Sequence, residues 1–286
     1  MSLQGLKGLD DDPRKKVMLK LCERFYPSPL GRSTAGKEED LKSLTAEKAA
    51  DLVNRHFDMS QTIFAVAGKY DFGAVCAQME KLFGDEPAKN QATIEIGQAD
   101  KGYTHEHNDG AQVHIGLMTP TVLPGDEDFY NARVAVSILS GGMSARLFTE
   151  VREKRGLCYA VGARYSGLKQ AAGISCYAGT TPEKGQETLD VTIKEFRRLA
   201  EGVSQAELDR AKVGLKSSVV MQSESSGSRS IAIATDHYLL GRVRTLDEIK
   251  QKIDETTVES VLEFLRSNMF EDFTLVTIGP NKLSFE

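Results

Sequence analysis

The sequence lacks tryptophan altogether and has only four cysteines, five histidines and eight prolines among its 286 residues. No apolar stretch approaches the ~20 residues that a membrane-spanning helix needs, so no membrane span is expected. The formal net charge of −5, with no dense run of lysine and arginine, argues against a nucleic-acid partner. No signal peptide is visible at the start. We therefore expect a soluble protein and leave its compartment open between cytoplasm and periplasm.

The cysteines have none of the close C-x-x-C spacings that are typical of metal sites. They are Cys22, Cys76, Cys158 and Cys176. Reduced and buried thiols are the simpler interpretation. However, Cys158 and Cys176 fall on the two arms of an expected hairpin, which leaves open a disulfide between them in an oxidising compartment.

The histidines are also poorly placed for a metal site on a helix. They are His56, His105, His107, His114 and His237, and no two are four residues apart. His105 and His107 could place both rings on one face of a strand, but no third ligand is identifiable. The pattern favours an edge strand or the polar end of a linker at this point.

What the sequence does contain is a faint internal repeat. The Leu-Gly-Arg at 30–32 reappears at 240–242, and the helical pattern that starts at Thr45 is matched by one that starts near Thr257. A period of roughly 210 residues indicates a duplicated domain rather than an array of short repeats. The first Leu-Gly-Arg has only 29 residues before it, so the first copy is expected to be truncated. We predict the rear part of the first domain and the start of a linker over 1–97, and a complete second domain over 98–286.

Strand and helix patterns place the chain in the α+β class, in which each copy is a mainly antiparallel sheet packed with helices. Apolar periodicity predicts strands over 62–67 and 112–118 and a hairpin with arms at 157–166 and 171–180. Residues 84–101 are polar and are the expected linker. Helices are predicted over 10–25, 37–42, 71–83, 126–140, 144–156 and 181–201. Capping boxes predict further helix starts at Ser204, Thr245 and Thr256, and the serine-rich 223–228 is expected to join two helices.

Residues 141–159 carry the densest candidate chemistry. Arg152 lies in the last turn of an expected helix, and Gly156 can take the left-handed conformation that reverses the chain. Tyr159 follows early in the next strand. A guanidinium and a phenol brought to one cavity are suited to donating hydrogen bonds to peptide carbonyls. The alternative is structural: Arg152 belongs to a solvated helix end, and Tyr159 is a core aromatic on the strand face of Leu157.

This segment resembles the second homologous half of the insulinase/pitrilysin family of zinc metallopeptidases, which includes mitochondrial processing peptidase. In that family, Gly-Gly-x-Ser-Ser-Arg-Leu-Phe leads into Val-Arg-Glu-Lys-Arg-Gly-Leu-x-Tyr. Here G-G-M-S-A-R-L-F at 141–148 leads into V-R-E-K-R-G-L-C-Y at 151–159, with Ala145 in place of the commoner serine. The resemblance implies two similar halves around a cleft. It also implies that Arg152 and Tyr159 are catalytic and substrate-binding residues that hold the substrate backbone near the zinc.

The family's zinc motif, H-x-x-E-H with a further glutamate, is absent from this sequence. The resemblance therefore implies that zinc is bound in the full-length protein by residues upstream of this chain, and that the chain alone binds none and cleaves nothing. Expected partners are a peptide or unfolded polypeptide substrate, the missing N-terminal half or a zinc-bearing partner subunit, and a second copy in a homodimer. The alternative functions are a non-catalytic partner subunit of a two-subunit peptidase and a structural core-type subunit.

Overall fold

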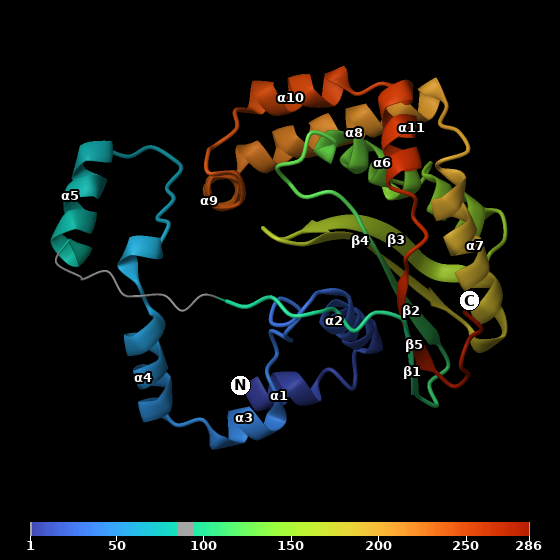
Figure 1. Cartoon of the computed structure of the whole chain (residues 1–286), viewed down its shortest axis with the longest axis horizontal. Helices are drawn as coiled ribbons and strands as arrows, with labels where there is room; N and C mark the ends of the chain where they lie inside the picture. The colour runs from blue at the N-terminus through green and yellow to red at the C-terminus, as the bar shows by residue number, and fades with distance from the viewer. Residues whose placement is uncertain (1, 85–93, 286) are drawn as a thin grey trace.

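The computed structural model describes residues 2–84 and 94–285 and is organised around one five-stranded sheet (Figure 1). The strands are β1 (Tyr103–His107), β2 (Val113–Pro120), β3 (Cys158–Gly167), β4 (Ala172–Thr180) and β5 (Thr274–Gly279). Their order across the sheet is β1-β5-β2-β4-β3. The β1–β5 pair is parallel, and the other pairs are antiparallel. The predicted α+β class, with a mainly antiparallel sheet, is confirmed.

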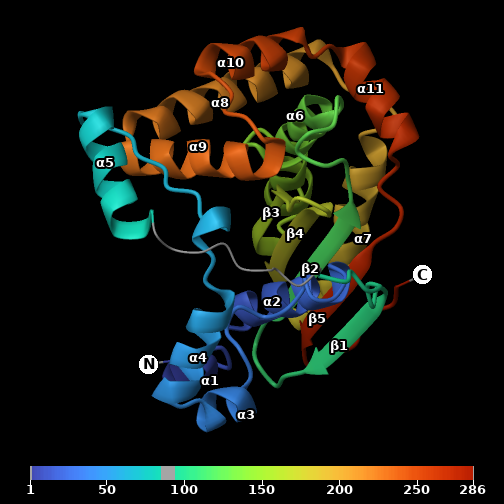
Figure 2. The same ribbon diagram turned by 60° about the vertical axis from the view of Figure 1, so that its left-hand side comes forward.

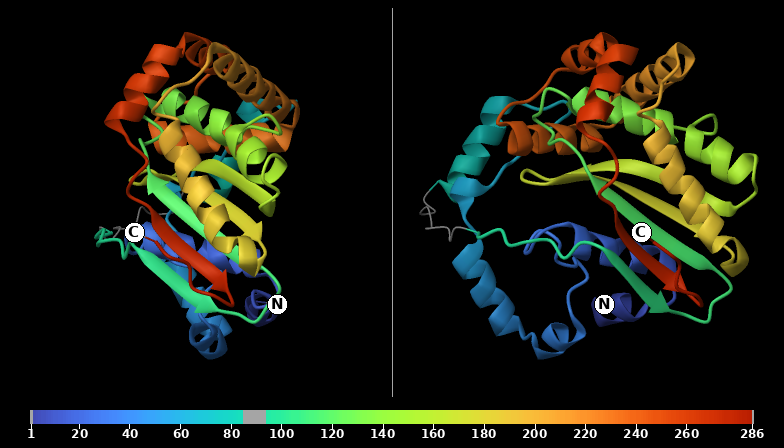
Figure 3. Two further views of the ribbon diagram at one scale, coloured as in Figure 1. Left: turned by 90° about the vertical axis from the view of Figure 1, so that its right-hand side faces the viewer. Right: turned by 45° about the vertical axis from the view of Figure 1, so that its right-hand side comes forward.

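Helices that follow β2 in the chain cover one face of this sheet (Figure 3). They include α6 (Phe129–Ser140), α7 (Gly185–Arg198), α8 (Gln205–Glu224), α10 (Leu246–Glu255) and α11 (Val258–Ser267). Because side chains alternate along a strand, Leu117 and Leu275 point to this face. They share the main core with Phe196 of α7 and Phe264 of α11. Each of these phenylalanines is about 1% exposed and stabilises the fold by roughly 2–3 kcal/mol through burial.

The opposite face of the sheet is covered by α2 (Pro13–Phe25), although this helix comes from the first part of the chain (Figure 2). Val17, Leu21 and Phe25 lie on one helix face and pack against Met118, Val276 and Ile278 of the strands. The helix approaches closely because glycines line its path. A Cβ at Gly173 would lie 2.7 Å from the Phe25 ring.

The remaining elements of the first part stand apart from the sheet (Figure 1). They are α1 (Ser2–Lys7), α3 (Glu38–Ser43), α4 (Ala46–His56), η1 (Met59–Gln61) and α5 (Phe72–Phe83). Several of their large apolar side chains are more than half exposed, among them Phe57, Phe64 and Phe72. Apolar surface of this kind is typical of a face that another chain or segment covers.

The predicted strand over 62–67 is wrong: these residues form no strand, and they are exposed at 62–64 and half-buried at 65–67. Their counterpart in the repeat, β5, lies between β1 and β2 and bonds to both. Among the described residues no strand lies beside 62–67. A β-branched, apolar sequence without a neighbouring strand has nothing to pair with, so its propensity alone does not make a strand.

The predicted helices and the hairpin are confirmed within a few residues, apart from the segment 144–156, which contains a π-helix. The predicted capping box of Ser204 and Glu207 is present at the start of α8. Ser225 caps α9 (Ser226–Leu240), where the sequence predicts that two helices join. The predicted start at Thr256 is wrong by one residue, because Thr257 caps α11 together with Ser260.

The predicted linker at 84–101 falls in large part on 85–93, which lie outside the described residues, and the domain boundary at 97/98 stays a prediction. In the described part of the chain, no helix is both long and apolar enough to cross a membrane.

The disulfide between Cys158 and Cys176 is not formed, and both thiols are free. Cys158 lies opposite Thr180 and Cys176 lies opposite Ala163. The two cysteines are therefore offset by four residues, roughly 13 Å along the strand at about 3.3 Å per residue. A disulfide needs Cα atoms within about 7 Å. Burial raises the pKa of the Cys176 thiol to about 12, so this sulfur is an inert core group.

Candidate substrate-binding site

The segment between α6 and β3 contains a π-helix, η2 (Phe148–Glu153). The sequence predicts an ordinary helix here. Instead, the N–H of Lys154 donates to the carbonyl of Thr149, five residues back, at 2.9 Å. A π-turn widens the backbone and changes the direction of the side chains that follow, and such turns are frequent at functional sites. Arg152 projects from this turn.

A left-handed glycine then reverses the chain, as predicted. Gly156 has φ +57°, and its N–H donates to the carbonyl of Arg152 at 3.1 Å. The bond from Gly156 is the 5→1 bond of an αL-type helix end, and the N–H of Leu157 donates to the carbonyl of Val151, six residues back, at 3.0 Å. This turn leads directly into β3 and sets where Tyr159 lies relative to Arg152.

We expect Gly156→Ala to destabilise the fold by about 1 kcal/mol, because a Cβ disfavours positive φ although nothing lies within 4 Å of it. The matched control is Gly214→Ala in α8, where a Cβ also meets nothing within 4 Å and φ is helical. That change should stabilise the fold by roughly 0.5–1 kcal/mol. Urea unfolding of both variants measures the contrast. Equal effects would show that the turn at Gly156 does not depend on glycine.

Tyr159 occupies a β-bulge on the edge strand. Cys158 lies opposite Thr180 and Ala160 lies opposite Gly179, so Tyr159 is the extra residue between them. Its side chain is 63% exposed. The alternative that Tyr159 is a core aromatic is therefore wrong. The bulge interrupts the alternation that would have placed it with the buried side chains of the strand.

Arg152 is exposed, and its guanidinium lies 4.9 Å from the centre of the Phe148 ring. Neighbouring charges are already paired: Glu150 accepts from Lys154 and Arg155 at 2.7 Å each. Hydrogen bonds from Lys154 and Arg155 lower the pKa of Glu150 to about 2. Within the described ranges Arg152 has no ion-pair partner, and no hydrogen bond joins it to Tyr159. The π-helix η2 and the strand β3 thus present a guanidinium and a phenol. Within the described residues, neither side chain donates a hydrogen bond.

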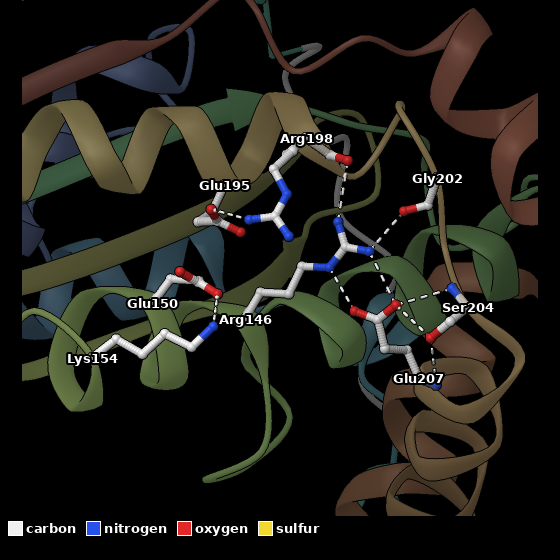
Figure 4. Close-up of polar contacts among 8 residues, drawn as sticks. All are labelled: Arg146, Glu150, Lys154, Glu195, Arg198, Gly202, Ser204 and Glu207. Atoms are coloured by element: carbon white, nitrogen blue, oxygen red, sulfur yellow. Dashed lines mark hydrogen bonds and ion pairs between the residues drawn. The ribbon is translucent and has the colours of Figure 1, made fainter.

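A buried ion pair holds the start of the π-helical segment, at Arg146, against the neighbouring helices (Figure 4). Arg146 is only 9% exposed. Its guanidinium donates to both carboxylate oxygens of Glu207, at 2.7 and 3.1 Å, and to the carbonyls of Arg198 and Gly202. Glu207 also caps α8 through Ser204. Arg146 therefore joins the start of the π-helical segment to α7 and α8. The sequence pattern assigned it no role, although it lies within the motif at 141–148.

The same ion pair predicts a pH dependence of stability. Burial by itself raises the pKa of Glu207, but hydrogen bonds from Arg146 and Ser204 outweigh it and lower the pKa from 4.5 to about 2. A depressed carboxyl pKa contributes stability above the unfolded-state value, and this is lost as the pH falls from about 4.5 to 2. The Glu207→Gln variant should have a lower free energy of unfolding than the native chain at pH 7. This difference should shrink as the pH falls from about 4.5 to 2. Urea unfolding at several pH values measures it, and a constant gap would contradict the assignment.

The residues that the structure describes do not fit a zinc site. Among the described residues, no three His, Cys, Asp or Glu side chains gather as metal ligands would. His105 and His107 lie on the edge strand β1, as the sequence favoured. His105 Nδ1 lies 2.9 Å from the hydroxyl of Thr277, while both ring nitrogens of His107 are in contact with Asp109 and the carbonyl of Pro280. What Arg152 and Tyr159 themselves can contribute is hydrogen bonding and positive charge.

The fold and the site define a class: an α+β domain with a five-stranded sheet, whose described residues form no metal site. The chain belongs to the M16 peptidase family, because residues 43–215 match the family model described as the peptidase M16 inactive domain. This confirms the resemblance to the insulinase/pitrilysin metallopeptidases.

The curated relatives include proteins named as zinc proteases. The chain is 29% identical to "Uncharacterized zinc protease YmxG" of Bacillus subtilis over 97% of its own length and 68% of the relative's. It is 26% identical to "Uncharacterized zinc protease Rv2782c" of Mycobacterium tuberculosis, over 98% of this chain and 66% of that protein. The chain thus spans about two thirds of the length of these relatives.

Solved structures share the fold. A peptidase M16 inactive domain from Pseudomonas fluorescens superposes with a TM-score of 0.86 at 22% identity, covering 99% of this chain and 69% of that one. A chain of complex III2 from Candida albicans gives 0.85 at 20% identity, covering 98% and 70%. At these identities the likeness concerns the fold alone.

Proposed function

We propose that this chain supplies the substrate-binding half of a zinc-dependent endopeptidase, in which Arg152 and Tyr159 hold the backbone of the cleaved peptide. The observation that carries the proposal is the bulge at Tyr159. It presents an exposed phenol on the edge strand β3, the strand that directly follows the π-helical segment with the exposed Arg152. Membership of the M16 family, with relatives named as zinc proteases, supports the reaction class.

The chemistry of the two side chains suits this role. The Tyr159 hydroxyl would donate a hydrogen bond to a substrate carbonyl oxygen and strengthen it as negative charge develops there. Arg152, whose charge is not neutralised by Glu150, would hold a second carbonyl or share that charge. Neither side chain needs to change its protonation state for this task.

The peptide itself would bind along β3. An edge strand has unpaired backbone N–H and C=O groups, and an extended peptide can pair with them as an added strand. Among the described strands, β3 pairs only with β4 and lies at the end of the sheet opposite β1. In this arrangement Tyr159 and Arg152 lie at the end of β3 where the strand begins.

The proposal places the zinc ligands on a segment or partner subunit outside this chain. Activity should therefore require both parts. The test is hydrolysis of a dye-quenched, unstructured peptide by the full-length protein and by this chain alone. Hydrolysis by the full-length protein that a chelator abolishes, with none by this chain, supports the proposal. A full-length protein that binds no zinc and cleaves nothing, even with candidate zinc-bearing subunits, would favour a non-catalytic or structural subunit instead.

A further inference from the structure

A cavity of ≈ 630 Å³ lies between α2 and the edge strand β3, on the sheet face opposite the main core. Its walls are apolar or small where the two elements meet. Met18 and Cys22 line it from α2, and Ala160 and Gly162 line it from β3. The cavity thus begins one residue beyond Tyr159 on the same strand.

Charged residues around this cavity are mostly cationic. Arg14 and Lys15 come from the first turn of α2, and Arg164 comes from β3. The one acidic residue, Asp12, already accepts a hydrogen bond from the backbone N–H of Lys15 at 3.0 Å and caps the helix. Within 2–84 and 94–285, neither Arg14 nor Arg164 has an ion-pair partner. The Arg14 guanidinium lies 4.8 Å from the centre of the Tyr177 ring, which helps to hold it in place.

We infer that this basic pocket binds a carboxylate side chain of the peptide that lies along β3, so that the protein prefers acidic residues near the cleaved bond. The inference rests on the proposed function, because it needs the peptide on β3. Guanidinium groups bind carboxylates through paired, charge-assisted hydrogen bonds. The overall charge of −5 repels acidic peptides, so such a preference must come from a local site.

The position of the pocket fixes where the acidic residue falls. An added strand places alternate side chains on each sheet face at about 3.3 Å per residue. The lining residues of β3 run from Ala160 to Arg164, so the carboxylate lies within about five residues of the bond next to Tyr159. β3 continues beyond the pocket to Gly167. The peptide backbone therefore passes the pocket, which favours an acidic side chain over a terminal carboxylate.

The test compares three dye-labelled, unstructured 12-residue peptides that differ only in a central Glu, Gln or Lys. Their dissociation constants for this chain are measured by fluorescence anisotropy. The Glu peptide should bind at least about tenfold more tightly than the Gln peptide, the lower end for a charge-assisted hydrogen bond. Arg14→Gln and Arg164→Gln should each reduce this ratio. Arg229→Gln, the same change at an exposed arginine of α9, should leave it unchanged.

Each contrary result has a distinct meaning. Equal binding of the Glu and Gln peptides overturns the acidic preference and leaves the proposed function standing. A preference that survives both pocket substitutions, or that falls equally with Arg229→Gln, overturns the assignment to this pocket. Failure of all three peptides to bind overturns the inference together with the peptide site on β3.

Discussion

Replacing Tyr159 with phenylalanine is expected to slow turnover of the full-length protein by about 10²-fold, the cost typical of one lost oxyanion donor. The substitution removes one hydroxyl and leaves the ring that the bulge presents. Because the side chain is largely exposed and its hydroxyl has no hydrogen-bond partner in the described part of the chain, stability should not change. The loss should therefore appear in kcat, while the unfolding midpoint stays the same.

The control for this prediction is Tyr238→Phe in α9. Tyr238 is 57% exposed, so the same hydroxyl is removed from a similarly exposed tyrosine away from β3. Its turnover should equal that of the native protein. Unchanged turnover in Tyr159→Phe would refute the assignment of Tyr159, and an equal loss in both variants would point to a general effect of the substitution.

Removing Arg146 is expected to produce the largest loss of stability. Arg146→Met leaves the Glu207 carboxylate partly buried without its cation, and it leaves the carbonyls of Arg198 and Gly202 without their donor. Breaking a buried ion pair from one side costs about 3 kcal/mol or more. Thermal unfolding should occur roughly 6–12 °C lower, at about 2–4 °C per kcal/mol for a domain of this size. Arg146→Lys should recover part of the lost stability, since lysine keeps the positive charge but lacks the planar guanidinium that donates two parallel hydrogen bonds.

An exposed pair gives the comparison. Arg242 contacts Glu248 with a similar geometry, but its side chain is 59% exposed. Solvent screens such pairs, so Arg242→Met should leave the unfolding midpoint nearly unchanged. If both substitutions had the same effect, the loss at Arg146 could not be assigned to a buried pair. If neither substitution changed the unfolding midpoint, Arg146 would not hold the start of the π-helical segment in place.

Local patterns were enough to predict most of the helices and strands after residue 98. Periodicity and capping residues gave the hairpin and the helices, because these elements satisfy their hydrogen bonds and bury their faces within the same copy. The strand prediction over 62–67 is wrong for the opposite reason. It has strand-like composition, but what makes a strand is a neighbour, and none of the described strands lies beside it. The packing of α2 against the sheet also depends on distant residues, and no local pattern in its sequence predicts it.

The sequence pointed to candidate site residues, whose roles stay a prediction, but it did not predict their geometry. The motif at 141–159 pointed to Arg152 and Tyr159, and Gly156 indicated the chain reversal between them. The π-turn and the bulge depend on register against neighbouring elements, which no local pattern encodes. Alternation alone assigned Tyr159 to the core face of its strand, and the extra residue of the bulge breaks that alternation.

Hydrogen–deuterium exchange with and without a saturating unstructured peptide tests the central claim most directly, namely that a peptide binds along β3 beside Tyr159 and Arg152. The claim predicts slower exchange for outward-facing amides of Cys158–Gly167, because an added strand accepts hydrogen bonds from them; Ala163 is left out because its N–H already donates to Ser140 Oγ at 2.8 Å. The other sheet edge, β1 (Tyr103–His107), provides an internal control and should exchange at the same rate in both samples. Protection confined to β3 is the expected result. Protection of β1 instead, or of neither edge, would contradict the account.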